Sequence, residues 1–186
     1  HTTYPNYEII VVDNGSSAQA RMALQNFQEE CAFIYLYEPM DFNFSVMCNL
    51  GAKKAGGEYL LLLNDDMEVL ADCADWLDRM VGQASLRHVG AVGAKLLYPN
   101  STLIQHAGVT NTISGPGHKL KGLDDTQSYY YGRNKLVYDM IGVTAACLLI
   151  RTKVYRALGG LYEGLRVAYN DVDLCFRLCE KGLCNV

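Results

Sequence analysis

The chain has 186 residues, of which 50% are hydrophobic and 19% are charged, and its formal net charge is −4. This composition is that of an ordinary globular protein, and the length suits one domain. The weak negative charge argues against nucleic acid or an anionic membrane surface as a partner, and no apolar segment approaches the roughly 18 residues needed to span a bilayer.

Apolar runs bounded by turn residues alternate along the chain with stretches that show helical spacing. The runs that we expect to be strands are 8–12, 33–37, 59–63, a segment within 88–97, and 143–150. The stretches that we expect to be helices are one after Ser16 or Ser17, 42–55, one through Trp76, Leu77 and Met80, 153–158, and one from about 170 to 182. This alternation predicts an α/β fold with a mainly parallel central sheet flanked by helices. We expect a single domain over residues 1–186.

Residues 111–133 form a long polar stretch that contains several glycines and three consecutive tyrosines. A loop of that length inside a compact domain is usually either functional or disordered. The seven cysteines are odd in number and irregularly spaced. Their pattern predicts reduced thiols in a reducing compartment and no zinc site.

The first predicted strand ends at Asp13-Asn14-Gly15-Ser16-Ser17. In open α/β sheets ligands bind at the carboxyl ends of the strands, so Asp13 is a candidate to accept hydrogen bonds from a nucleotide base or ribose. Ser16 is a candidate donor beside it. The same tetrapeptide also satisfies an Asx-turn or a helix cap without any ligand. From these residues alone both interpretations stay open.

In the stretch 58–66, Leu60 to Leu63 form an unbroken apolar run that ends in Asn64-Asp65-Asp66. Two adjacent carboxylates repel each other and become favourable when they share a divalent cation. Oxygen ligands favour a hard ion such as Mg²⁺ or Mn²⁺, which completes its shell with water and substrate phosphates. The alternative is that Asp65 or Asp66 caps the next helix.

A third acidic cluster, Asn170-Asp171-Val172-Asp173, stands where the last helix is expected to begin. Asp171 would then lie in the first turn, where the helix dipole stabilises a carboxylate. This favours either a plain helix start or a general base that takes a proton from an acceptor hydroxyl. Asp173 and Arg177 are four residues apart and are predicted to pair on one helix face.

These three segments, 9–17, 63–66 and 170–175, occur in the order found in nucleotide-sugar-dependent glycosyltransferases of family 2, which have the GT-A fold, and the chain resembles that family. Further segments resemble its bacterial rhamnosyltransferase-type branch. They are 42–45, 49–52, 89–96, 105–108 and 159–161.

The resemblance implies roles for the acidic residues. Asp13, with Ser16 nearby, would contact the donor nucleotide, and Asp66, with Asp65 beside it, would hold the Mg²⁺ or Mn²⁺ that bridges the diphosphate. Asp171 matches the base of inverting members. We also expect the segment from Gly115 to Lys121, with His118, to cover the pyrophosphate.

The resemblance implies an inverting, metal-dependent transferase that moves a sugar from a UDP- or dTDP-linked donor to a saccharide or lipid-linked acceptor. The product would be a bacterial cell-surface polysaccharide. We expect a cytoplasmic location, either free in the cytoplasm or at the inner face of the cell membrane, and the resemblance leaves membrane association of the full-length protein open.

Two segments of the family pattern are absent, a first strand beside the Asp13 strand and a C-terminal part with a histidine. We therefore expect a domain truncated at both ends. One alternative is a truncated nucleotide-binding domain without catalysis. The other is a sugar-phosphate nucleotidyltransferase, against which the acidic segment after the first strand argues, because that class needs a basic, glycine-rich loop there. An oxidoreductase is disfavoured because no G-x-G-x-x-G motif follows a strand.

Overall fold

The computed structural model describes residues 1–186, which form nine short strands and five α-helices. The strands are β1 (Ile10–Asp13), β2 (Ile34–Tyr37), β3 (Tyr59–Leu63), β4 (Ala91–Gly93), β5 (Leu96–Leu97), β6 (Ile104–His106), β7 (Val109–Thr112), β8 (Gly115–His118) and β9 (Cys147–Arg151). The helices are α1 (Ala18–Glu30), α2 (Phe44–Lys54), α3 (Trp76–Ala84), α4 (Thr152–Ala157) and α5 (Asn170–Glu180), with 3₁₀ turns η1 (Ala71–Cys73) and η2 (Arg133–Lys135). No helix combines the length and apolar character that a membrane span needs.

The α/β class predicted from the sequence is confirmed, and each expected helix and strand is present with shifted ends. The pairing of the strands differs from the prediction of a mainly parallel sheet. Only β1 and β2 pair in parallel, whereas β9 lies antiparallel between β3 and β4. An unbroken apolar run reports burial on both faces of a strand but not the direction of its neighbour, which explains the difference.

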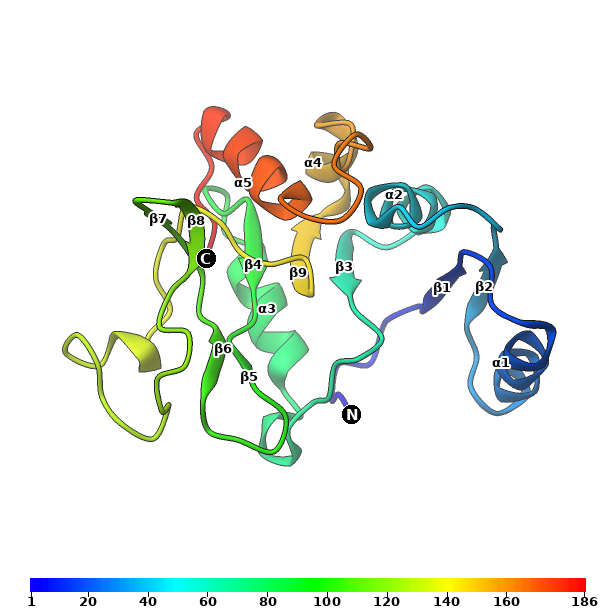
Figure 1. Cartoon of the computed structure of the whole chain (residues 1–186), viewed down its shortest axis with the longest axis horizontal. Helices are drawn as coiled ribbons and strands as arrows, with labels where there is room; N and C mark the ends of the chain where they lie inside the picture. Colours follow the sequence, from blue (N-terminus) through cyan, green and yellow to red (C-terminus); the bar gives the residue numbers. More distant parts are fainter.

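The β3–β9–β4 sheet has helices on both faces, and alternate residues of its strands point to opposite faces (Figure 1). Leu60, Leu62, Leu148 and Ile150 pack in a cluster with residues of α2, α4 and α5. The alternate residues of the same strands point to the other face and pack with α3; of these, Cys147 and Leu149 are buried. These two clusters make β9 the most enclosed strand of the fold.

The stretch 111–133, expected to be a loop, begins with a hairpin. Strand β8 pairs antiparallel with β7, with Thr112 opposite Gly115. The Thr112 hydroxyl donates to the Gly115 carbonyl at 2.7 Å, and Gly115 has a φ of 113°, which favours glycine. The prediction was wrong for this part because Gly-Pro-Gly has no apolar or β-branched side chain, so the strand pattern was missing.

Helix α2 connects the β1–β2 pair to the larger sheet. Its Gly51 lies against Val12 of β1, where an added Cβ would stand 3.3 Å from the valine methyl, and its Ala52 belongs to the cluster on β3 and β9. Strand β1 pairs only with β2, and β3 pairs only with β9, so each has one unpaired edge. The resemblance places the additional strand beside β1, and that placement stays a prediction.

Asn49 of α2 is the buried polar centre that joins α2 to the segment after α4. Its amide nitrogen donates to the Leu161 carbonyl at 2.9 Å, and its oxygen accepts from the Leu161 amide at 3.0 Å and from the Tyr155 hydroxyl at 2.7 Å. A Cβ added to Gly160 would stand 2.2 Å from the Asn49 oxygen, so only glycine fits beside this network. Each bond compensates the burial of a polar group.

Asp13 fixes the end of β1 and the turn that follows. One carboxylate oxygen accepts from the amides of Gly15 and Ser16 at 2.9 and 2.8 Å, and the other accepts from the Tyr35 hydroxyl of β2. Burial acts to raise the pKa of Asp13, but the hydrogen bonds from Tyr35, Gly15 and Ser16 outweigh it and lower the pKa to about 2. Burial and the bond to Asp13 raise the pKa of Tyr35 to about 12.

Replacing Asn49 by leucine should leave the Leu161 carbonyl without a donor and the Tyr155 hydroxyl without its acceptor. The Leu161 amide would keep only its longer bond, at 3.3 Å, to the Tyr155 hydroxyl. We expect the free energy of unfolding to fall by about 3 kcal/mol, measured by urea denaturation. The exposed Asn26 of α1 gives a matched control, and Asn26→Leu should change the stability by less than about 0.5 kcal/mol. Equal effects of the two substitutions would contradict this role.

Replacing Tyr35 by phenylalanine should raise the pKa of Asp13 above about 2, because one donor to the carboxylate is lost while burial remains. The folded-state pKa lies below the ordinary value of 3.8, so the stabilisation is present above pH 3.8 and is lost as the pH falls towards 2. The carboxyl ¹³C shift of Asp13, followed against pH, measures both values. Identical titration curves for wild type and variant would show that the hydroxyl does not hold the carboxylate.

Candidate active site

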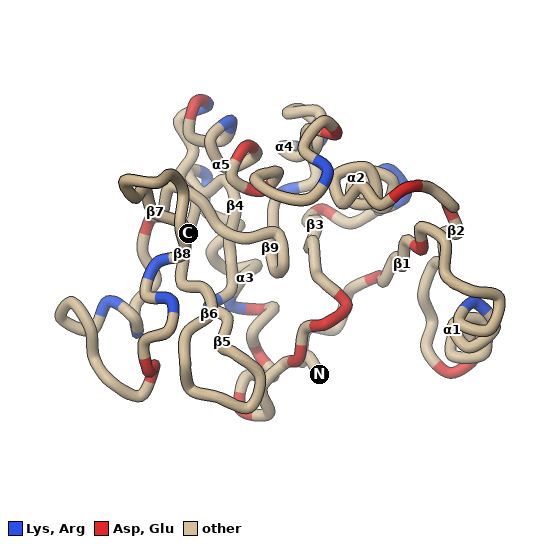
Figure 2. Tube along the Cα trace, viewed as in Figure 1, with Lys and Arg blue, Asp and Glu red and all other residues tan.

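The acidic pair after β3, Asp65 and Asp66, neither caps a helix nor takes part in an ion pair. Asp65 and Asp66 lie in a turn and are exposed. The chain that follows β3 is coloured red for its acidic residues in Figure 2. Neither caps the next helical segments, whose N-cap residues are Leu70 and Asp75. The ion pairs of the structure all involve other carboxylates. The capping alternative is therefore excluded by the geometry.

The pair suits a hard cation only with further ligands. The structure contains no group of three or more His, Cys, Asp and Glu side chains placed to hold a metal ion. Two carboxylates with exposed oxygens are nevertheless the donor set that Mg²⁺ and Mn²⁺ accept, since these ions keep waters and take substrate phosphates as ligands. The residues present fit a metal that arrives with a diphosphate.

Residues Thr144, Ala145 and Ala146, here called the 144–146 segment, lead directly into β9. The Ala146 carbonyl accepts from the Asn64 amide at 3.0 Å, immediately before the acidic pair. The Ala145 amide donates to Oδ2 of Asp171 at 3.1 Å. Because Leu63 is the register partner of Cys147, the antiparallel pairing brings this segment to the end of β3. The segment thereby joins the acidic pair to Asp171.

Asp171 is the half-buried second residue of α5, and its other oxygen accepts from the Val172 amide at 2.8 Å. Helix α5 starts after Tyr169, which has a φ of 64° and provides no side-chain cap. The predicted pair of Asp173 and Arg177 is confirmed at 2.7 Å, and Arg177 also donates to the carbonyls of Leu158 and Gly160. The carboxylate of Asp171 is thus oriented by a backbone amide on a well-anchored helix.

His118 does not lie in a loop but ends β8, and its side chain faces a second histidine. Its Nδ1 is 2.6 Å from Nδ1 of the buried His106 on β6, with the two rings almost perpendicular. Nε2 of His106 accepts from the Thr144 amide at 3.3 Å. Burial, with the nearby His118, lowers the pKa of His106 to about 4, so this ring is neutral at pH 7.

Asp13 and Ser16 lie on the separate β1–β2 pair, and no hydrogen bond connects them to the residues above. The Asx-turn interpretation of Asp13 is confirmed by the two amide bonds. Ser17, not Ser16, caps α1 through a bond from the Ala20 amide at 3.2 Å. The exposed Ser16 hydroxyl is left available to a ligand.

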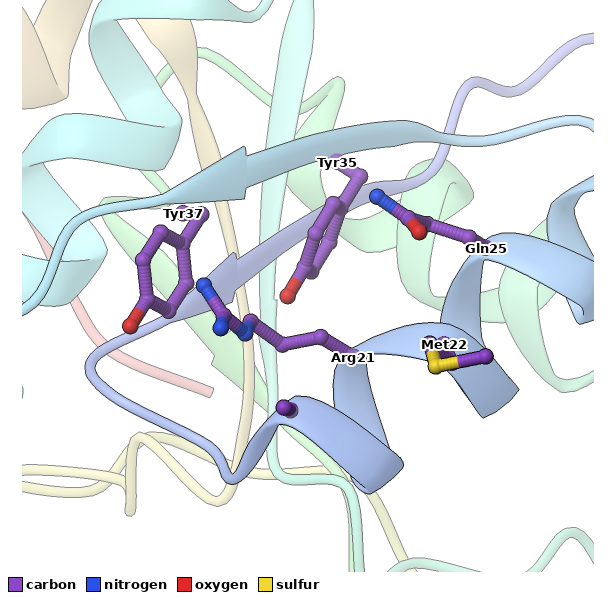
Figure 3. A pocket seen from close by; sticks show the side chains of 6 residues that line it. Arg21, Met22, Gln25, Tyr35 and Tyr37 are labelled. Carbon is purple, nitrogen blue, oxygen red and sulfur yellow. The ribbon is translucent and has the colours of Figure 1, made fainter.

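Sequence reasoning missed a groove of about 340 Å³ beside Asp13, between α1 and β2 (Figure 3). Arg21 lies with its guanidinium 4.3 Å from the centre of the Tyr37 ring, and Tyr35 reaches Asp13 from the same strand face. The one available signal was the Tyr35–Tyr37 spacing of two, which places both rings on one face of a strand.

The comparisons with known proteins identify the family of this chain. Residues 1–159 match the family model described as glycosyl transferase family 2. The O-antigen biosynthesis protein RfbC of Myxococcus xanthus is 39% identical over 184 residues, which cover 98% of this chain and 14% of that protein. The uncharacterized protein y4gI of Sinorhizobium fredii is 40% identical over 191 residues, which cover 100% of this chain and 20% of that protein.

A solved structure shows the same fold. The mannosyltransferase PcManGT from Pyrobaculum calidifontis, in complex with GDP-Man and Mn²⁺, superposes with a TM-score of 0.69 at 16% identity. The match covers the whole of this chain and 47% of that protein. This chain thus spans a fifth or less of the curated relatives and about half of the structural neighbour. By the family match over residues 1–159, the chain belongs to glycosyl transferase family 2, and it has the GT-A fold of these enzymes.

Proposed function

We propose that this chain is the donor-binding and catalytic domain of an inverting, metal-dependent glycosyltransferase. The donor is a nucleoside-diphosphate sugar and the acceptor is a saccharide or lipid-linked saccharide of a bacterial cell-surface polysaccharide. The reaction belongs in the cytoplasm, at the inner face of the membrane if the acceptor is lipid-linked. The name of RfbC supports the polysaccharide, and the bound GDP-Man and Mn²⁺ of PcManGT support the donor class and the metal.

One observation carries the proposal. The 144–146 segment binds Asp171 with one residue and the residue before the acidic pair with the next. A candidate base and a candidate metal site are therefore fixed by the same short backbone stretch.

The residues then divide the work of a displacement at the anomeric carbon. Asp65 and Asp66 would hold Mg²⁺ or Mn²⁺, which would supply positive charge to the diphosphate leaving group. Asp171 accepts the proton of the acceptor hydroxyl while the acceptor oxygen forms its bond to the anomeric carbon and the bond to the diphosphate oxygen breaks. Asp13 and Ser16 contact the nucleoside, and His118 lies over the pyrophosphate.

The donor site is tested by calorimetric titration with UDP, dTDP and GDP, each with and without Mn²⁺. We expect one nucleotide to bind in a Mn²⁺-dependent way, and Asp66→Ala to weaken that binding by about tenfold or more. Glu29→Ala removes an exposed carboxylate of α1 and should bind like the wild type. A folded wild type that binds none of the three nucleotides would contradict the proposed donor site.

The base is tested with Asp171→Asn, because the asparagine oxygen still accepts from the Ala145 amide but the side chain cannot take a proton. The substitution gives up the bond from the Val172 amide, since the asparagine nitrogen is not an acceptor. Release of nucleoside diphosphate from the donor that binds best should slow by about 10²-fold or more. Nucleotide affinity should stay within about twofold of the wild type, since the amide preserves the contact with the segment. Unchanged turnover in this variant would remove Asp171 from the mechanism.

A further inference from the structure

His106 is buried, with 1% of its surface exposed, and the proposed mechanism assigns it no role. A buried imidazole is costly unless its two nitrogens have partners. Here both nitrogens have one: Nε2 faces the Thr144 amide at 3.3 Å, and Nδ1 faces Nδ1 of His118 at 2.6 Å. The surroundings of this ring therefore define how it is protonated.

The hydrogen bonds assign one tautomer to the pair. The Thr144 amide is a donor, so Nε2 of His106 must carry a lone pair and its proton must sit on Nδ1. That proton is donated to Nδ1 of His118, which leaves the His118 proton on Nε2. His106 thus accepts a hydrogen bond from the Thr144 amide through Nε2 and donates one to His118 through Nδ1.

Nε2 of His106 contacts the first residue of the 144–146 segment. Thr144 binds His106, Ala145 binds Asp171, and Ala146 binds Asn64. Residues 143–146 lie outside the strands, and backbone bonds in this stretch reach only carbonyls, such as that of Ala146. The amides of all four residues donate to side-chain acceptors. Side-chain contacts therefore decide where its amides point.

We propose that His106 is a positioning residue that holds the 144–146 segment, and through it Asp171 and the acidic pair, in place. The role in the reaction rests on the proposed function, whereas the effect on the segment does not. The proposal commits to one atom: Nε2 of His106 must be an unprotonated acceptor for the Thr144 amide.

Two substitutions of similar polarity separate this role from simple filling of space. The side-chain amide of glutamine superposes on the Nε2 end of histidine, whereas that of asparagine superposes on the Nδ1 end. His106→Gln keeps an acceptor for the Thr144 amide, and His106→Asn keeps only the side that faces His118. His88→Asn, at an exposed histidine, is the control.

The first readout is amide hydrogen exchange of the ligand-free chain, which requires no substrate. We expect exchange at Thr144, Ala145 and Asn64 to rise by about tenfold in His106→Asn and to stay within about twofold of wild type in His106→Gln and His88→Asn. The second readout is Mn²⁺-dependent affinity for the nucleotide that wild type binds best among UDP, dTDP and GDP. It should fall by about fivefold in His106→Asn and recover in His106→Gln.

Equal exchange at the three amides in folded His106→Asn and wild type would overturn the proposal, as would a glutamine variant that behaves like asparagine. If neither variant folds, the imidazole ¹⁵N shifts of wild type decide, because a protonated Nε2 on His106 contradicts the role and an unprotonated one supports it. Failure of the proposed function appears separately, as a wild type that binds no nucleotide while its exchange pattern is as expected.

Discussion

The antiparallel pairing of β9 with β3 is the constraint on which the site depends. Strand β9 is buried from Cys147 to Ile150 and needs neighbours on both edges, which β3 and β4 supply. Its direction brings the start of β9 to the end of β3. A parallel β9 would have carried the residues before it to the opposite edge of the sheet, away from Asp65 and Asp66.

The chemistry is consequently built from backbone as much as from side chains. An amide of the 144–146 segment orients Asp171, and a carbonyl of the same segment fixes the chain just before the acidic pair. Asp65 and Asp66 themselves stay exposed and form no ion pair with a protein cation. The backbone of the 144–146 segment is thus the fixed part of the candidate site, and the carboxylate oxygens of Asp65 and Asp66 are left for ligands.

Much of this could be predicted from the sequence. Long apolar runs and glycine stops located the helices and the strands of the core. Acidic residues at strand and helix ends marked Asp13, Asp65, Asp66 and Asp171 as candidate site residues, and their roles stay predictions. The direction of β9 could not be predicted, because the sequence pattern of a strand that is buried on both faces is the same whether its neighbours run parallel or antiparallel. The β8 strand and the His106–His118 contact also escaped, since Gly-Pro-Gly lacks a strand pattern and the two histidines meet only through the pairing of distant segments.

The central claim is that the acidic pair and Asp171 face one site. Paramagnetic broadening by Mn²⁺, added with the nucleoside diphosphate that binds best, tests it most directly on the ¹⁵N-labelled chain. The account predicts that the amide signals of Asp65, Asp66, Ala145 and Asp171 broaden together at substoichiometric Mn²⁺. Those of Glu29 and Glu30, at the C-terminal end of α1 and far along the chain from Ser16, should not broaden. Broadening at Asp65 and Asp66 that leaves Ala145 and Asp171 sharp would contradict it.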